Sequence, residues 1–132
     1  MANYKVGNGP QQISLAVDIA TNGIAGTRGT LNKQGNPPIP VANSSDVTGD
    51  ILPAQEIGSA NSLQGSVLTI STIIDLRLFP DRNAREAESK NVKSTYMLDN
   101  GIDGHVADNN PENKIVDPEF NSVILIKLFN LL

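Results

Sequence analysis

The sequence contains no cysteine and no tryptophan, one histidine, and only five aromatic residues, two tyrosines and three phenylalanines. Without cysteine there can be no disulfide, no thiol nucleophile and no cysteine-containing zinc site. A histidine-based hydrolytic triad would have to use His105, yet the serine motif of the common hydrolases, G-x-S-x-G, does not occur. We therefore expect a protein without catalytic activity and with no cofactor.

Long hydrophobic runs and an excess of positive charge are also missing. The most apolar segment, residues 123–132, contains Lys127 and as a helix would rise only about 15 Å, half of a bilayer's hydrocarbon core of about 30 Å. The N-terminal residues show no basic region followed by an apolar run, so no signal peptide is visible. A formal charge of −4 disfavours a nucleic-acid partner. We expect no membrane span and no nucleic acid.

The residues that are present favour an all-β fold. Eleven glycines and eight prolines are spread along the chain, and short runs of isoleucine, valine, leucine and threonine lie between them. A chain of 132 residues suits one domain. We predict a single antiparallel β-sandwich over residues 1–132, Greek-key-like, with about seven to eight strands and at most one short helix near residues 81–89.

The strongest hairpin pattern covers residues 13–31. Apolar and small or polar residues alternate from Ile13 to Ile19, and Asn22-Gly23 follows, a pair typical of a tight two-residue turn. The returning strand would run over residues 24–31. Gly26 inside it indicates a bulge or the close approach of another backbone.

The middle of the chain predicts a connection and two further strands. Residues 32–49 contain three prolines and are expected to connect the two sheets. A strand at 50–57 contains Pro53 and should lie at an edge. The long alternating segment 66–79 would measure about 46 Å when extended, more than the diameter of about 36 Å expected for the domain. It must therefore bend or change sheets, and Ile73 is the expected point.

The C-terminal segment 121–132 is apolar on both faces of a strand. Three structures are consistent with this pattern: an interior strand, a subunit contact, and a peripheral helix. The β-branched residues and the short length favour a strand. The two faces are Ile124, Ile126 and Leu128 on one side, and Val123, Leu125 and Phe129 on the other.

This pattern predicts a protein–protein interaction or assembly module that associates with itself, or with another protein, through strand edges. The residues expected to pack at that interface are Ile124, Ile126, Leu128 and Phe129. Arg82 and Arg85 lie in a basic stretch and are expected to face the acidic loops of a second copy.

The acidic loops at residues 99–119 suggest an alternative function. Asp99, Asp103 and Asp108 supply the oxygen ligands that calcium prefers, so the alternative is a calcium- or carbohydrate-binding β-sandwich. The same Asp, Asn and Gly residues also build ordinary turns. We favour turns, because the spacing lacks the bidentate glutamate and the flanking helices of a calcium-binding helix-loop-helix.

A thermal melt separates the two functions. If the acidic loops only form turns, calcium at millimolar concentration leaves the melting temperature unchanged relative to magnesium. A calcium-specific increase that saturates with concentration would instead support the alternative.

Overall fold

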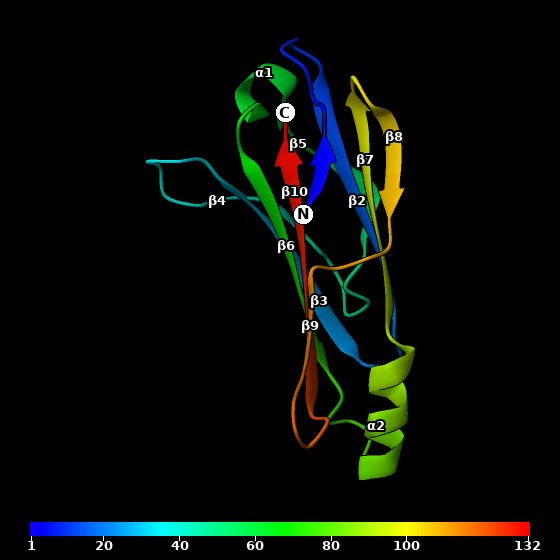
Figure 1. The fold of residues 1–132 in the computed structure, drawn as a ribbon. Coiled ribbons are helices and arrows are strands. Elements are labelled where there is room, and N and C mark those ends of the chain that lie inside the picture. Colours follow the sequence, from blue (N-terminus) through cyan, green and yellow to red (C-terminus); the bar gives the residue numbers. More distant parts are fainter.

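A computed structural model describes all 132 residues and shows two β-sheets packed face to face (Figure 1). Sheet A has the order β1-β10-β6-β3-β4, and β9 also pairs with β10. Its strands are β1 (Ala2–Tyr4), β3 (Ile24–Asn32), β4 (Ile39–Asn43), β6 (Val67–Asp75), β9 (Asn113–Val116) and β10 (Ser122–Leu131). Sheet B, in the order β5-β2-β7-β8, contains β2 (Gln12–Ala20), β5 (Ile51–Ser59), β7 (Lys93–Gly101) and β8 (Gly104–Asp108). The all-β, sandwich-like prediction is confirmed, and short edge strands raise the number of strands to ten.

The core lies between the sheets and follows from the period-2 pattern of the strands. Every second residue of β10, from Val123 to Leu131, is buried, and β2 buries its isoleucine, leucine and valine positions in the same way. Together the two inner faces form one cluster of 23 buried hydrophobic residues. The C-terminal segment is therefore an interior strand of sheet A, paired on both edges.

The predicted hairpin over residues 13–31 is wrong in its pairing, although both strands exist. β2 pairs with β5 and β7 in sheet B, whereas β3 pairs with β4 and β6 in sheet A. Neither Asn22 nor Gly23 has the positive φ that a tight hairpin turn needs. The Glu88 carboxylate accepts hydrogen bonds from the Asn22 amide and the Thr21 hydroxyl. These bonds fix the connection between β2 and β3, where the chain passes from sheet B to sheet A.

The long segment 66–79 bends where β6 ends, at Asp75, and does not change sheets at Ile73 as predicted. The Asp75 carboxylate accepts hydrogen bonds from the backbone amide and the guanidinium of Arg77. These bonds hold the pKa of Asp75 well below its usual value, at about 2. The chain then leaves the sheet and enters helix α2.

The helices are short. α2 (Arg82–Asn91) confirms the helix expected near residues 81–89, and the Asp81 side chain accepts a hydrogen bond from the Asn83 amide at its start. α1 (Ala60–Leu63) was not predicted. Neither helix has the length and apolar character needed to cross a lipid bilayer.

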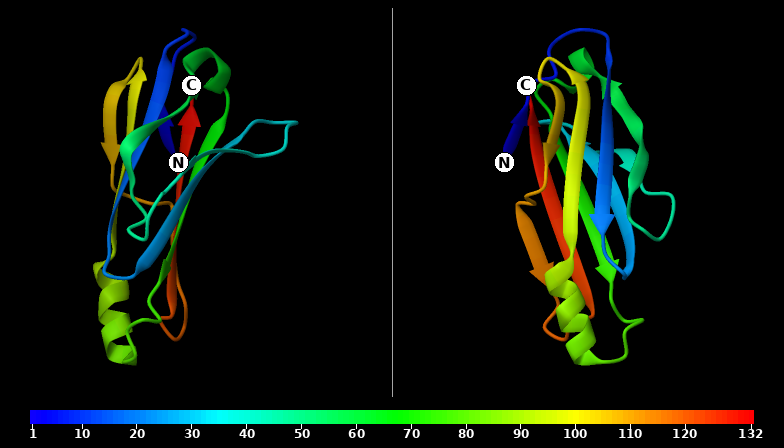
Figure 2. Two further views of the ribbon diagram at one scale, coloured as in Figure 1. Left: turned by 180° about the vertical axis from the view of Figure 1, so that it is seen from behind. Right: turned by 90° about the vertical axis from the view of Figure 1, so that its right-hand side faces the viewer.

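Two smaller predictions meet different outcomes. The strand containing Pro53 is β5, and it lies at the edge of sheet B as expected. The connection 32–49 contains an unexpected strand, β4, which pairs with β3 in sheet A before the chain crosses to sheet B. Figure 2 shows this connection extending away from the body of the sandwich.

A lysine is buried on the inner face of β10. Lys127 is 2% exposed, and its ammonium lies 3.0 Å from the Asp108 carboxylate and 3.6 Å from Glu112. It also donates to the Asn110 carbonyl at 2.8 Å. Since Asp108 ends β8 and the other two partners lie in the segment after it, the buried charge holds the crossover from sheet B to β9 against sheet A.

The same contacts determine the protonation of Asp108. Burial alone would raise the pKa of this carboxyl, but the Asn110 amide and the Lys127 ammonium outweigh that effect and lower it. A carboxylate with a lowered folded-state pKa stabilises the fold above its unfolded pKa, and this stabilisation is lost as the pH falls through the folded pKa.

We therefore expect Asp108→Asn to lower the free energy of unfolding at neutral pH by about 1–3 kcal/mol, because the Lys127 ammonium loses its closest carboxylate. Urea denaturation at several pH values measures this difference, which should shrink once the pH falls below the pKa of Asp108. Glu56→Gln, on an exposed side chain of β5, is the control with the same change of charge. A difference that is independent of pH would contradict this interpretation.

Candidate functional site on the outer face of sheet A

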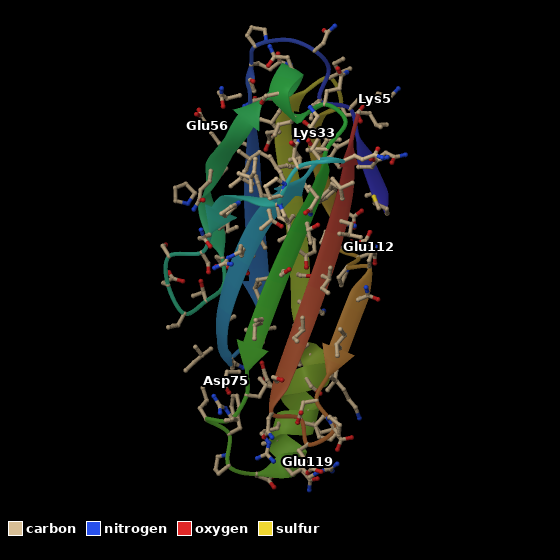
Figure 3. The ribbon with its side chains drawn as sticks, turned by 90° about the vertical axis from the view of Figure 1, so that its left-hand side faces the viewer. Lys5, Lys33, Glu56, Asp75, Glu112 and Glu119 are labelled. Carbon is tan, nitrogen blue, oxygen red and sulfur yellow. The ribbon has the colours of Figure 1, made fainter.

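The outer face of sheet A is not covered by any other part of the chain (Figure 3). Three isoleucines from three neighbouring strands stand side by side on it: Ile115 pairs with Ile124, and Ile124 pairs with Ile73. Ile115 is 52% exposed and Ile73 is 59% exposed. We call these three residues the isoleucine row.

Other apolar side chains extend the row along the strands. Ile126 and Leu128 follow Ile124 on the outer face of β10, and both are half-buried. Ile24, at the start of β3, is 48% exposed. The remaining outer positions are Val67, Thr69, Ser71 and Asp75 on β6, and Gly26, Arg28, Thr30 and Asn32 on β3, so only two of these eight positions are charged.

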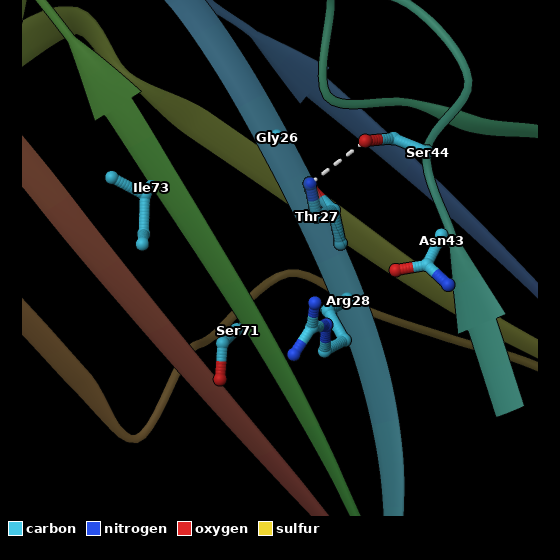
Figure 4. A pocket seen from close by; sticks show the side chains of 7 residues that line it. All are labelled: Gly26, Thr27, Arg28, Asn43, Ser44, Ser71 and Ile73. Atoms are coloured by element: carbon cyan, nitrogen blue, oxygen red, sulfur yellow. Dashed lines mark hydrogen bonds between the residues drawn. The ribbon is translucent and has the colours of Figure 1, made fainter. Parts of the chain in front are cut away.

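The row ends at a hollow over β3 (Figure 4). Gly26 pairs with Ile73, and a Cβ atom placed on Gly26 would meet no atom within 4 Å. Gly26 therefore marks open space rather than the bulge or close backbone approach predicted from the sequence. The hollow has a volume of about 570 Å³ and is lined by Gly26, Thr27, Arg28, Asn43, Ser44, Ser71 and Ile73.

Polar groups surround the hollow on the side of β4. The Ser44 hydroxyl accepts a hydrogen bond from the Thr27 amide at 2.9 Å, which holds the loop after β4 against the edge of β3. Arg28 is exposed and has no carboxylate within ion-pair distance. The hollow therefore offers one free guanidinium beside an apolar wall formed by Ile73.

The residues predicted for an interface are separated by the fold. Ile124, Ile126 and Leu128 lie on the outer face. Phe129 is fully buried in the core, where its ring lies 5.0 Å from the Lys127 ammonium. Phe129 therefore packs between the sheets and does not reach the surface.

Arg82 and Arg85 are bound within the chain. Arg82 pairs with Glu119 at 3.4 Å and lies over the Phe120 ring at 4.8 Å. Arg85 donates to the backbone carbonyls of Phe79, Pro80 and Glu119. The two arginines thus attach α2 to the turn before β10, and the acidic partner expected from a second copy is supplied by the same chain.

The acidic residues proposed as metal ligands have separate partners. Asp99 lies 2.8 Å from His105, the Asp103 carboxylate accepts a bond from the Lys5 amide at 2.8 Å, and Asp108 pairs with Lys127. No three histidine, aspartate or glutamate side chains form a group placed to hold a metal ion. No hydroxyl hydrogen-bonds to the His105 ring. The calcium alternative stays a prediction.

Strand edges, the expected route of association, are short or interrupted. β1, β9, β8 and β4 have only three to five residues each. The edge of β4 contains Pro40, and the Gln55 side chain bonds to both backbone groups of Asn43. Pro53 interrupts β5. Features of this kind reduce pairing with another chain.

Comparison with protein-family models finds no matching family, and comparisons with curated proteins and with solved structures find no match.

The sequence identified this surface only in part. It marked the outer residues of β10, and it marked Ile73 only as the point where the long segment 66–79 was expected to bend or change sheets. Ile115 and Arg28 were missed, because their strands become neighbours of β10 and β6 only through pairing between distant segments. No local pattern reports that kind of proximity.

Stability measurements can test the difference between Arg85, which is bound within the chain, and Arg28, which is free. We expect Arg85→Gln to lower the free energy of unfolding by about 1–2 kcal/mol, because a charged donor to three backbone carbonyls is lost. Arg28→Gln, with the same change of charge, should alter it by less than about 0.5 kcal/mol. Urea denaturation measures both. Equal effects would contradict the proposed role of Arg85.

Proposed function

We propose that this protein is a non-catalytic self-association module, in which a second copy binds the outer face of sheet A. The supporting observation is the isoleucine row, which crosses three paired strands and is left in contact with water by the chain's own fold. Contiguous exposed apolar surface of this kind is characteristic of protein interaction sites.

The size of the face fits an interface between proteins. Nine residue pairs join β10 to β6, which corresponds to a length of about 30 Å, and four strands including β9 and β3 span about 19 Å. Because β9 has only four residues, the projected area is about 500 Å², and the accessible area is larger because side chains roughen the surface. A standard interface buries about 800 Å² on each partner.

The charges on this face fit a second copy of the same chain. Only two charged positions lie on the outer faces of β3 and β6 around the row: Arg28, two residue pairs beyond it, and Asp75, two residue pairs before it. A two-fold axis along the row would stack each isoleucine on itself. It would also bring Asp75 of the second copy, whose carboxylate already binds Arg77 of its own chain, over Ser71 and next to Arg28, so that the carboxylate lies between two guanidinium groups.

Association through this face differs from the edge pairing expected from the sequence. The edges of β10 are already occupied by β6 on one side and by β1 and β9 on the other. Ile124, Ile126 and Leu128 can therefore reach a partner only through their side chains, and burying apolar area contributes about 25 cal/mol per Å².

Substitution of the row tests the proposal. We expect the wild-type chain to associate as its concentration rises, and Ile73→Glu to shift the protein to monomer, because a carboxylate would be buried at the centre of the interface. Sedimentation velocity over a range of concentrations measures the association. The melting temperature of diluted samples should change little, because Ile73 faces solvent in the monomer.

Ile39→Glu is the matched control. Ile39 is 55% exposed, and it lies on β4 opposite Leu31, a partly buried residue that packs against the core, so its side chain does not share the outer face. The Ile39→Glu variant should associate like the wild type. A wild-type chain that stays monomeric at high concentration would sink the proposal, as would equal effects of the two substitutions.

A further inference from the structure

A second cavity lies on the inner side of sheet A, beside the segment that connects β8 to β9. Figure 1 shows this segment crossing from one sheet to the other. It has a volume of about 370 Å³. Its lining comes from three distant parts of the chain: the start of β7, the crossover with β9, and the inner face of β10. The lining residues are Val92, Lys93, Ser94, Thr95, Asn109, Pro111, Lys114 and Leu125.

The charged side chains of this lining are both cationic and unpaired. Lys93 and Lys114 are exposed, and neither has a carboxylate within ion-pair distance or a side-chain hydrogen bond. This is notable in a chain of net charge −4. By contrast, Lys127, just inside the same sheet, is fully engaged by Asp108, Asn110 and Glu112.

Neutral donors complete the wall. The Ser94 and Thr95 hydroxyls and the Asn109 amide side chain make no hydrogen bond within the protein, whereas Val92, Pro111 and Leu125 provide an apolar floor. Two ammonium groups with hydroxyl and amide donors are the groups that bind oxyanions in proteins.

A buried hydroxyl beside the cavity also lacks a partner. Tyr96 is fully buried and its hydroxyl makes no hydrogen bond. Burial raises the pKa of Tyr96, the nearby Ser94 side chain lowers it in part, and the Glu112 and Asp108 charges raise it further. The hydroxyl therefore lies close to Ser94 in the cavity wall, but not in hydrogen-bonding geometry. Native proteins rarely leave a buried hydroxyl without a partner, because its lost contact with water is then not compensated.

We propose that this cavity is a binding site for a small oxyanion, a carboxylate or phosphate group held by Lys93 and Lys114 and by the hydroxyl of Ser94. Tyr96 supports the site: if the Ser94 hydroxyl turns to donate to the anion, its oxygen can move into position to accept the Tyr96 hydroxyl, which has no partner in the free protein. Binding would thus satisfy both hydroxyls together. The site is separate from the outer face of sheet A and does not depend on self-association.

Amide NMR of the full chain tests this proposal with two probes, acetate and inorganic phosphate, at ionic strength held constant with chloride. We expect saturable shifts of the amides at residues 93–95 and 109 with at least one probe. Saturation by acetate alone identifies a carboxylate ligand, and saturation by phosphate alone identifies a phosphate group. The absence of saturable shifts at these amides with both probes would overturn the proposal.

Two double variants distinguish a built site from general charge attraction. Lys93→Gln with Lys114→Gln should weaken binding about tenfold or more. Lys5→Gln with Lys33→Gln removes the same charge from two unpaired lysines outside the cavity and should leave the affinity unchanged. Equal losses in the two double variants would contradict a specific site.

Tyr96→Phe tests whether the Tyr96 hydroxyl contributes to binding of the anion or affects only the stability of the fold. Without any probe it should raise the denaturant midpoint, because the unsatisfied hydroxyl is removed. It should also weaken binding of the probe several-fold. Unchanged affinity in a more stable variant would show that Tyr96 takes no part in the site.

Discussion

Strand β10 is apolar on both faces, and the fold covers only one of them. Its inner face supplies Val123, Leu125, Phe129 and Leu131 to the core, while its neighbours in sheet A satisfy the backbone on both edges. The outer face stays in contact with water, and so do the neighbouring isoleucines, Ile73 on β6 and Ile115 on β9. The core, the register of sheet A and the proposed interface all depend on this placement of one strand.

The charged residues that looked available for a partner are used within the chain. Arg82 and Arg85 attach α2 to the turn at Glu119, and Lys127 holds the crossover after Asp108. These contacts fix the ends of the sandwich, where the connections between sheets are long. They leave an outer face with few charges, which suits contact with an identical face because like charges are not forced together.

The two proposed sites differ in the chemistry of their side chains. The outer face is broad and apolar and offers area, whereas the cavity beside Lys93 and Lys114 is small and is lined by two cations and by no carboxylate. The cavity also sits next to Tyr96, where the fold leaves a buried hydroxyl unsatisfied. Local conflicts of this kind are common at functional positions.

Periodicity and turn residues determined which segments are strands, including β2, β3, β6, β7 and β10, and Pro53 placed β5 at an edge. They could not determine the pairing of β2 and β3, because alternation shows which face of a strand is buried but not which strand lies beside it. Nor could they show that Arg85 binds Glu119 of its own chain, or that residues 92–95 meet Lys114 across the sandwich. Only the tertiary structure decided these points, since each depends on contacts between segments far apart in the sequence.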